Sequence, residues 1–152
     1  MLTNVKLLEQ FGRVRRSLGR AASPLIRELG IGPKQLVAVR LIGKFDECSM
    51  LEIADGTNSD KASVTRMITS LVDSGWLQRR PGKLDRRQTM ISLSPKGRRN
   101  LLKIEQVYGR IADMFVASLS KEESQQLSVL FTKIEMDCNA QLNLIGQVAS
   151  EI

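Results

Sequence analysis

The sequence contains no histidine at all. Without an imidazole, neither a Ser-His-Asp nor a Cys-His catalytic arrangement can be built, and no histidine-ligated zinc or iron site can form. A hydrolase that uses carboxylates alone stays open, but acidic residues such as Glu52, Asp55, Glu122 and Glu123 suit helix starts and solvated faces better than catalysis. We therefore expect that the protein is not an enzyme and that it needs neither a cofactor nor a metal ion.

Cysteine and aromatic residues are also scarce. The two cysteines, Cys48 and Cys138, are too few for a disulfide framework, so we expect them to be reduced and buried in a cytoplasmic protein. Residues 1–16 hold no apolar run long enough for a signal peptide or a membrane span, so no membrane partner is expected. The six aromatic residues mark no ligand pocket.

Positive charge, by contrast, is abundant and concentrated in one segment. Residues 59–103 hold eleven Lys and Arg against three Asp, which is a local net charge of +8. The other 107 residues hold twelve basic and thirteen acidic groups, a net of −1, so this segment carries the whole formal excess of +7. Such a segment is typical of a surface that binds a polyanion, although from charge alone a merely soluble basic face fits equally well.

Two helices are predicted before residue 45. The apolar residues of the first recur at spacings of three and four: Leu7, Phe11, Val14 and Leu18. The stretch 21–32 is less regular and contains Pro24, so we expect the first helix to break before Pro33. Pro33 suits the first turn of a second helix over about residues 34–44, with an inward stripe of Leu36, Val39 and Ile42.

Two further short helices follow, joined by a tight turn. Ser49-Met-Leu-Glu52 is a capping box and predicts the start of the third helix. Asn58 tolerates the left-handed conformation that a tight turn needs, and either Ser59 or Asp60 can cap the next helix. That helix ends at Gly75, and its apolar stripe is Val64, Ile68, Leu71 and Val72.

After Gly75 the periodicity changes to that of a β-hairpin. Residues 76–80 and 89–93 are short strand-like runs, joined by a basic loop over residues 81–88. Lys83, Arg86 and Arg87 repel one another in this loop, which favours an anionic partner. We interpret Asp85 as holding Arg87 in one orientation through a charge-assisted bond; an incidental surface ion pair is the alternative.

The two helices and the hairpin together form the pattern of a winged helix-turn-helix that binds double-stranded DNA. The second helix of such a unit enters the major groove. Small hydroxyl residues allow a close approach to phosphates and bases, and an arginine can bind guanine with two hydrogen bonds. The predicted DNA-facing side carries Ser59, Lys61, Ser63, Thr65, Arg66, Thr69 and Ser70. A solvated face in an unrelated helical protein is the alternative for this helix alone.

Two amphipathic helices are predicted after the hairpin, one over about residues 96–119 and one that begins at the capping box of Ser120 and Glu123. Their apolar sides are larger than one small winged-helix unit can cover. A second copy of the chain is the simplest cover, so we expect a homodimer.

Over roughly residues 36–97 the sequence resembles the MarR family of winged helix-turn-helix transcriptional regulators. The residues that carry the resemblance are Met50-Leu-Glu-Ile-Ala54, Ala62-Ser-Val-Thr-Arg66, Leu71-Val-Asp-Ser-Gly75-Trp, Leu84-Asp-Arg-Arg87 and Ile91-Ser-Leu-Ser-Pro-Lys-Gly97. The chain departs from the family at Asn58, where a glycine is common. It also lacks the first-helix cysteine of peroxide-sensing members.

The resemblance implies a mainly helical fold with a β-hairpin wing, and a homodimer bound to a pseudo-palindromic operator. Recognition helices would lie in successive major grooves and wings in the flanking minor grooves. By position, Arg87 would be the minor-groove arginine and Asp85 its orienting partner. Bases or nearby phosphates would be contacted by Ser63, Thr65 and Arg66, and the DNA backbone by Lys83 and Arg86.

The predicted organisation is an N-terminal dimerisation region (1–32), a DNA-binding domain (33–97) and C-terminal dimerisation helices (98–152), intertwined in one unit. The leading hypothesis is a sequence-specific regulator, which we expect to be a repressor, with activation left open. Many members of the family respond to small phenolic or anionic effectors. The resemblance alone is the reason to consider such an effector for this protein. The alternatives are a nucleoid-type protein of low sequence specificity and a winged helix used for protein contacts.

Overall fold

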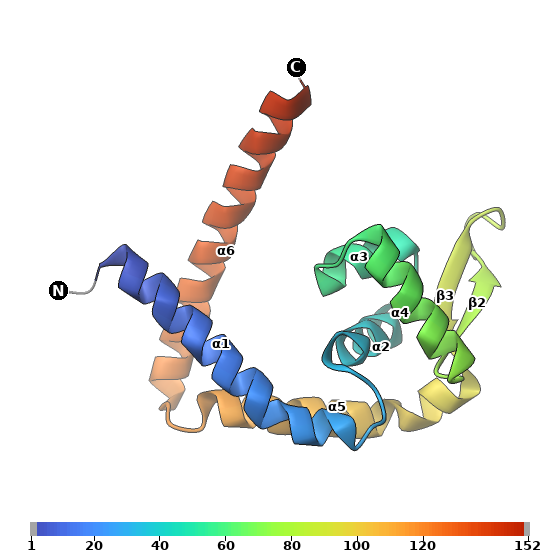
Figure 1. The fold of residues 1–152 in the computed structure, drawn as a ribbon, viewed down its shortest axis with the longest axis horizontal. Helices are drawn as coiled ribbons and strands as arrows, with labels where there is room; N and C mark the ends of the chain where they lie inside the picture. Colours follow the sequence, from blue (N-terminus) through green and yellow to red (C-terminus); the bar gives the residue numbers. More distant parts are fainter. Residues whose placement is uncertain (1–2, 151–152) are drawn as a thin grey trace. The chain divides into compact units, whose positions relative to one another are not determined.

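The computed structural model describes residues 3–150, with side chains described for residues 3–142. The described chain forms α1 (Asn4–Arg27), α2 (Pro33–Phe45), β1 (Glu47–Cys48), α3 (Met50–Thr57), α4 (Lys61–Asp73), β2 (Leu77–Pro81), β3 (Thr89–Leu93), α5 (Pro95–Val116) and α6 (Lys121–Ser150) (Figure 1). The predicted fold class, mainly helical with a small β-hairpin wing, is confirmed. Two compact units divide between Ala112 and Asp113.

Helix α1 extends further than its apolar periodicity predicts. It runs through Pro24 to Arg27, and the expected break before Pro33 occupies residues 28–32. Pro24 lies on the exposed side of the helix, where water can bond to the carbonyl that proline leaves unpaired. On the other side Ala22 and Ile26 are buried in the core. This packing offsets the hydrogen bond lost at Pro24.

The start of α3 and the turn after it follow the sequence prediction closely. The Glu52 amide donates to Ser49 Oγ (3.2 Å), and the Ser49 amide donates to the Glu52 carboxylate (2.7 Å), which completes the capping box. The hydrogen bond from the Ser49 amide is the main reason why the pKa of Glu52 is lowered. Asn58 ends α3 in the left-handed conformation, with φ 46°. The turn therefore has the geometry that asparagine was expected to allow.

Helix α4 is capped by Asp60 and fixed by its apolar side. The side chains of Val64, Ile68 and Leu71 are at most 1% exposed, as their spacing predicts. The helix stops before Gly75, whose φ of 77° belongs to the left-handed region. Both ends of α4 and three of the four residues of its predicted stripe are thus confirmed, while the fourth, Val72, is only half-buried.

The sheet has three strands in the order β1-β3-β2, all antiparallel. The hairpin of β2 and β3 was predicted, but its first strand begins at Leu77 instead of Trp76. Strand β1 was not predicted. It pairs Glu47 with Ser92 and Cys48 with Ile91, and two residues are too few to give an alternating pattern.

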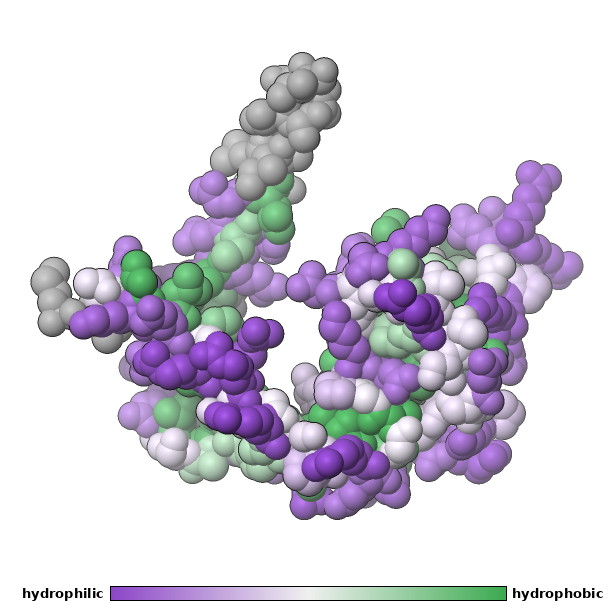
Figure 2. Space-filling model, in the orientation of Figure 1, coloured by the Kyte–Doolittle hydropathy of each residue, from purple (hydrophilic) through white to green (hydrophobic). Residues whose placement is uncertain are grey.

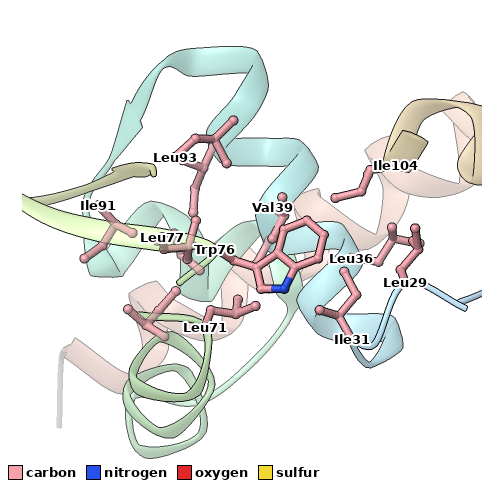
Figure 3. Packing of buried hydrophobic residues seen from close by; sticks show 14 of the residues in the cluster. Leu29, Ile31, Leu36, Val39, Leu71, Trp76, Leu77, Ile91, Leu93 and Ile104 are labelled. Carbon is pink, nitrogen blue, oxygen red and sulfur yellow. The ribbon is translucent and has the colours of Figure 1, made fainter. Parts of the chain in front are cut away.

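Trp76 occupies the junction between the end of α4 and the sheet. Its indole is 6% exposed and lies among Leu36, Val39 and Leu71 in Figure 3. Leu36, Val39 and Ile42 form the buried stripe of α2, as predicted. The tryptophan therefore acts as a core anchor that joins α2, α4 and the hairpin.

The two cysteines differ in their surroundings. Cys48 is buried, and this burial, with smaller effects of Glu52 and Glu47, raises its pKa to about 11. The prediction that Cys138 is also buried is wrong, because Cys138 is exposed on α6. It follows Ile134 by one helical turn, and Ile134 is itself 53% exposed. The apolar side on which both lie is thus open in the single chain.

No helix within residues 3–150 is both long enough and apolar enough to cross a membrane.

Gly97 in α5 provides a test of the packing at this junction. A methyl group at Gly97 would collide with the main-chain carbonyl oxygen of Trp76. We expect Gly97→Ala to lower the free energy of unfolding by about 1–3 kcal/mol, as overpacking does. Urea denaturation followed by circular dichroism at one protein concentration measures the change.

Gly109 is the matched control because it lies in the same helix with no atom within 4 Å of an added Cβ. Gly109→Ala should raise the stability by about 0.5–1 kcal/mol through helix propensity. Equal stability of Gly97→Ala and the unaltered protein would show that α5 does not pack against Trp76 as described.

Candidate nucleic-acid interface

The side of α4 opposite the core is polar and open to solvent. Lys61, Thr65, Arg66 and Thr69 are exposed, whereas Ser63 is half-buried. In Figure 1 the helix lies beside the β2–β3 hairpin, so one surface carries both predicted DNA-binding elements. Ser59 precedes the helix cap and is half-buried.

A chain of hydrogen bonds orders the first turns of α4. The Asp60 carboxylate accepts from the Ser63 amide (2.9 Å) and from Ser63 Oγ (2.7 Å), and Ser63 Oγ accepts from Arg66 (3.3 Å). The hydrogen bond from the Ser63 amide is the larger of two effects that hold the pKa of Asp60 below its usual value, and the hydrogen bond from the Ser63 hydroxyl is the smaller. Ser63 therefore links the helix cap to the arginine, and Arg66 keeps further N–H donors for another partner.

Thr65 is bonded within its own helix. Its hydroxyl donates to the carbonyl of Lys61 (2.8 Å). The donor of this side chain is therefore occupied, while its methyl group and its oxygen lone pairs remain. A threonine in this state suits an apolar contact with a thymine methyl group or a donor on a neighbouring base.

The tip of the wing is exposed and basic. Lys83, Arg86 and Arg87 are all exposed, and the loop stands out as hydrophilic in Figure 2. Its backbone is closed by bonds from the Gly82 amide to Gln88 (2.9 Å) and from the Gln88 amide to Asp85 (3.1 Å). The Lys83 amide also donates to the Glu47 carboxylate (3.3 Å), which ties the loop to β1.

The bond between Asp85 and Arg87 differs from the one expected. The Asp85 carboxylate accepts from the main-chain amide of Arg87 (2.9 Å), and the structure records no ion pair between the two side chains in the described residues. Asp85 thus orders the turn that carries Arg87 and leaves the guanidinium available. The predicted bond to the arginine side chain is not the one formed, because the carboxylate bonds to the backbone amide instead.

Three polar residues outside the predicted set contact the DNA-facing side of α4 or the turn that precedes it. Lys34 Nζ lies 2.9 Å from Ser59 Oγ and 3.3 Å from the Asn58 carbonyl. The side-chain amide of Gln35 donates to Ser70 Oγ (3.3 Å), and the Arg79 guanidinium donates to Thr69 Oγ1 (3.3 Å). Lys34 and Gln35 precede α4 by more than 20 residues, so no local pattern could reveal these contacts.

The cations of this surface lack acidic partners. Within residues 3–142 the single ion pair joins Arg40 to Glu105 (2.9 Å), and Arg40 also lies 3.5 Å above the Tyr108 ring. The same residues contain no group of three or more His, Cys, Asp or Glu that could hold a metal ion. A surface of uncompensated cations and hydroxyl groups is suited to binding a polyanion.

Comparison with known proteins decides the family. A model of the MarR family matches residues 31–89, which span α2 to the tip of the wing. These residues form a MarR-family domain. It is similar to the HTH-type transcriptional regulator BilQ of Clostridium symbiosum, with 29% identity over 109 residues that cover 72% of this chain and 76% of BilQ.

Solved structures of MarR-family proteins share the fold. A mutant MarR from E. coli complexed with operator DNA superposes with a TM-score of 0.75 at 22% identity, covering 84% of this chain and 92% of that one. BpsR of Bordetella bronchiseptica, whose DNA binding is regulated by 6-hydroxynicotinic acid, gives a TM-score of 0.74 at 20% identity, covering 84% and 91%. With this MarR-family domain and a relative named as a transcriptional regulator, the protein is a DNA-binding transcriptional regulator, and such regulators are not enzymes.

The Asp85 bond leads to a prediction that separates its two roles. Asparagine can accept the same bond from the Arg87 amide, whereas alanine cannot. We expect Asp85→Ala to weaken DNA binding by about 1 kcal/mol per protomer, or roughly fivefold, because the wing turn loosens. Asp85→Asn should bind as well as the unaltered protein.

Fluorescence anisotropy with labelled duplex DNA at fixed salt measures both affinities. A loss with Asp85→Asn as large as with Asp85→Ala would show that the negative charge matters and that Asp85 orients the guanidinium itself.

Proposed function

We propose that the protein binds a pseudo-palindromic operator in double-stranded DNA as a homodimer and represses transcription. The observation that carries this proposal is the shared surface of α4 and the wing. Its hydroxyl groups stand beside cations that no carboxylate neutralises in the described chain. Such a surface provides both base-reading donors and phosphate contacts.

In this proposal α4 reads bases in the major groove. Arg66 uses one donor on Ser63 and can direct the others to the acceptor edge of a guanine. Ser63 and Thr65 contact bases or nearby phosphates around it, and Lys61 adds charge beside the N-terminal turn of the helix. Ser59 in the turn before α4 and Thr69 within the helix extend this surface.

The wing enters the flanking minor groove. Arg87 is carried on a turn that Asp85 orders, with its guanidinium available. Narrow A·T-rich minor grooves have an enhanced negative potential that attracts such an arginine. Lys83 and Arg86 on the same exposed loop bind the backbone on either side.

The dimer rests on apolar surface in α1 and in α6. Val5, Leu8 and Val14 of α1 are 45–72% exposed, and Leu130 and Ile134 of α6 are each 53% exposed. Figure 2 shows apolar side chains on the surface of the described part of α6. Exposed apolar surface of this extent favours association, and we assign residues 1–32 and 98–152 to dimerisation.

An effector completes the proposal. The DNA binding of BpsR is regulated by 6-hydroxynicotinic acid, a small anionic aromatic compound. Because this chain shares the fold and the family, we propose that a small phenolic or anionic compound releases it from its operator.

The proposed DNA contacts predict the effect of two arginine substitutions. After in vitro selection of a bound duplex, Arg66→Ala should lose about 1–3 kcal/mol and relax the preference at one base pair. Arg87→Ala should weaken binding most where the flanking sequence is A·T-rich, because it removes the minor-groove cation. Gel-shift titrations on the selected duplex and on single-base variants measure both effects.

Lys44 is the control, because it is an exposed cation in the last turn of α2, outside both the proposed DNA interface and the proposed dimerisation regions. Lys44→Ala should bind like the unaltered protein. Unchanged binding by Arg66→Ala and Arg87→Ala, or a selection that enriches no sequence, would contradict the proposed operator recognition.

The proposed dimer predicts a mass of two chains in sedimentation equilibrium at micromolar concentration. Leu130→Glu should shift the equilibrium toward the monomer, because it places a charge in the apolar surface of α6. Leu51→Glu is the control, since Leu51 is 70% exposed but lies on α3. A stable monomer for the unaltered chain would rule out the dimer.

A further inference from the structure

Lys34 is a cation whose side chain reaches the polar side of α4 from another helix. It lies in the first turn of α2, and its ammonium group rests on Ser59 Oγ and on the Asn58 carbonyl. Both partners are uncharged, so the positive charge of Lys34 is held in place without being neutralised. An ammonium group has three donors, and these bonds leave one of them over.

Arg79 stands in the same situation further along α4. It belongs to β2, and its guanidinium donates one bond to Thr69 Oγ1. The hydroxyl carries no charge, and four further N–H donors of the guanidinium remain. The side chain is exposed.

A cation with a structural role in this chain is bonded differently. Arg40 meets a carboxylate with two hydrogen bonds, at 2.9 and 3.0 Å, and is stacked on Tyr108. Its charge is compensated by that carboxylate. Lys34 and Arg79 have no carboxylate partner within the described residues.

The two cations reach the DNA-facing surface at different points along α4. Lys34 bonds to Ser59 in the turn before the helix, and Arg79 bonds to Thr69 within it. The major groove of B-DNA is about 12 Å wide and is bordered by one phosphate chain on each side. Cations that flank a helix in this groove can therefore meet the phosphates that border it.

The geometry points to Lys34 and Arg79 as two further DNA-binding residues, which hold backbone phosphates that border the groove that α4 enters. This inference rests on the proposed function and assigns new residues to it. Ser59 and Thr69 then act as positioning residues that direct these two cations, instead of contacting bases themselves.

The test is the salt dependence of DNA affinity for Lys34→Met and Arg79→Met. Each phosphate contact contributes about 0.9 to the slope of log K against log salt concentration, so a dimer that loses two contacts should show a slope smaller by about 1.8. The advantage of the unaltered protein should accordingly shrink about tenfold between about 50 and 200 mM salt. The loss should be equal on the selected duplex and on a scrambled one.

Lys44→Met is the matched control, because Lys44 lies at the opposite end of the same helix and its removal changes the net charge equally. We expect its slope to differ little from that of the unaltered protein. Lys34→Arg should restore most of the slope, and circular dichroism with thermal melting checks that each variant folds.

The results separate this inference from the proposed function. If Lys34 only caps the C-terminal end of α3, Lys34→Met lowers the melting temperature and leaves the slope unchanged, which overturns its assignment. Equal slopes for Arg79→Met and the unaltered protein overturn the assignment of Arg79. If the unaltered protein shows no preference for a selected duplex, the proposed function itself fails.

Discussion

Burial of Val64, Ile68 and Leu71 sets the rotation of α4 about its own axis, and the DNA-facing surface depends on that rotation. All three side chains are at most 1% exposed. Turning the helix by one residue would expose apolar surface at a cost of about 1.5–3 kcal/mol per side chain. Lys61, Thr65 and Arg66 are consequently held toward solvent. Trp76, packed between the end of α4 and α2, carries the same constraint into the hairpin.

Features that depend on neighbouring residues were predicted from the sequence. The capping box of Ser49 and Glu52 and the left-handed turn at Asn58 need contacts only within a few residues, and the stripe of α4 shows in the spacing of its apolar residues. The hairpin was also predicted, because its two strands are adjacent in the chain. Local hydrogen bonding and periodicity decide such features before tertiary packing begins.

Features that depend on contacts between distant residues were not predicted from the sequence, and one predicted hydrogen bond was assigned to the wrong donor. Strand β1 exists only because β3, more than 40 residues later, pairs with it. The contacts of Lys34 and Arg79 with α4 arise from the packing of helix and strand, which no spacing reveals. At Asp85 the residue was predicted but its bonding atom was not, since a carboxylate two residues from an arginine can choose the amide or the guanidinium.

In the proposed dimer each of these contacts counts twice, and this changes what an effector must do. Binding of the second protomer to its half-site is intramolecular once the first is bound, which raises the overall affinity by about 10²–10⁴ when the two sites match in spacing. A change in the distance between the two α4 helices removes this gain without covering any of their side chains. An effector that shifts the dimerisation helices therefore needs no contact with α4. The exposed polar surface of α4 can remain unaltered while its affinity for the operator falls.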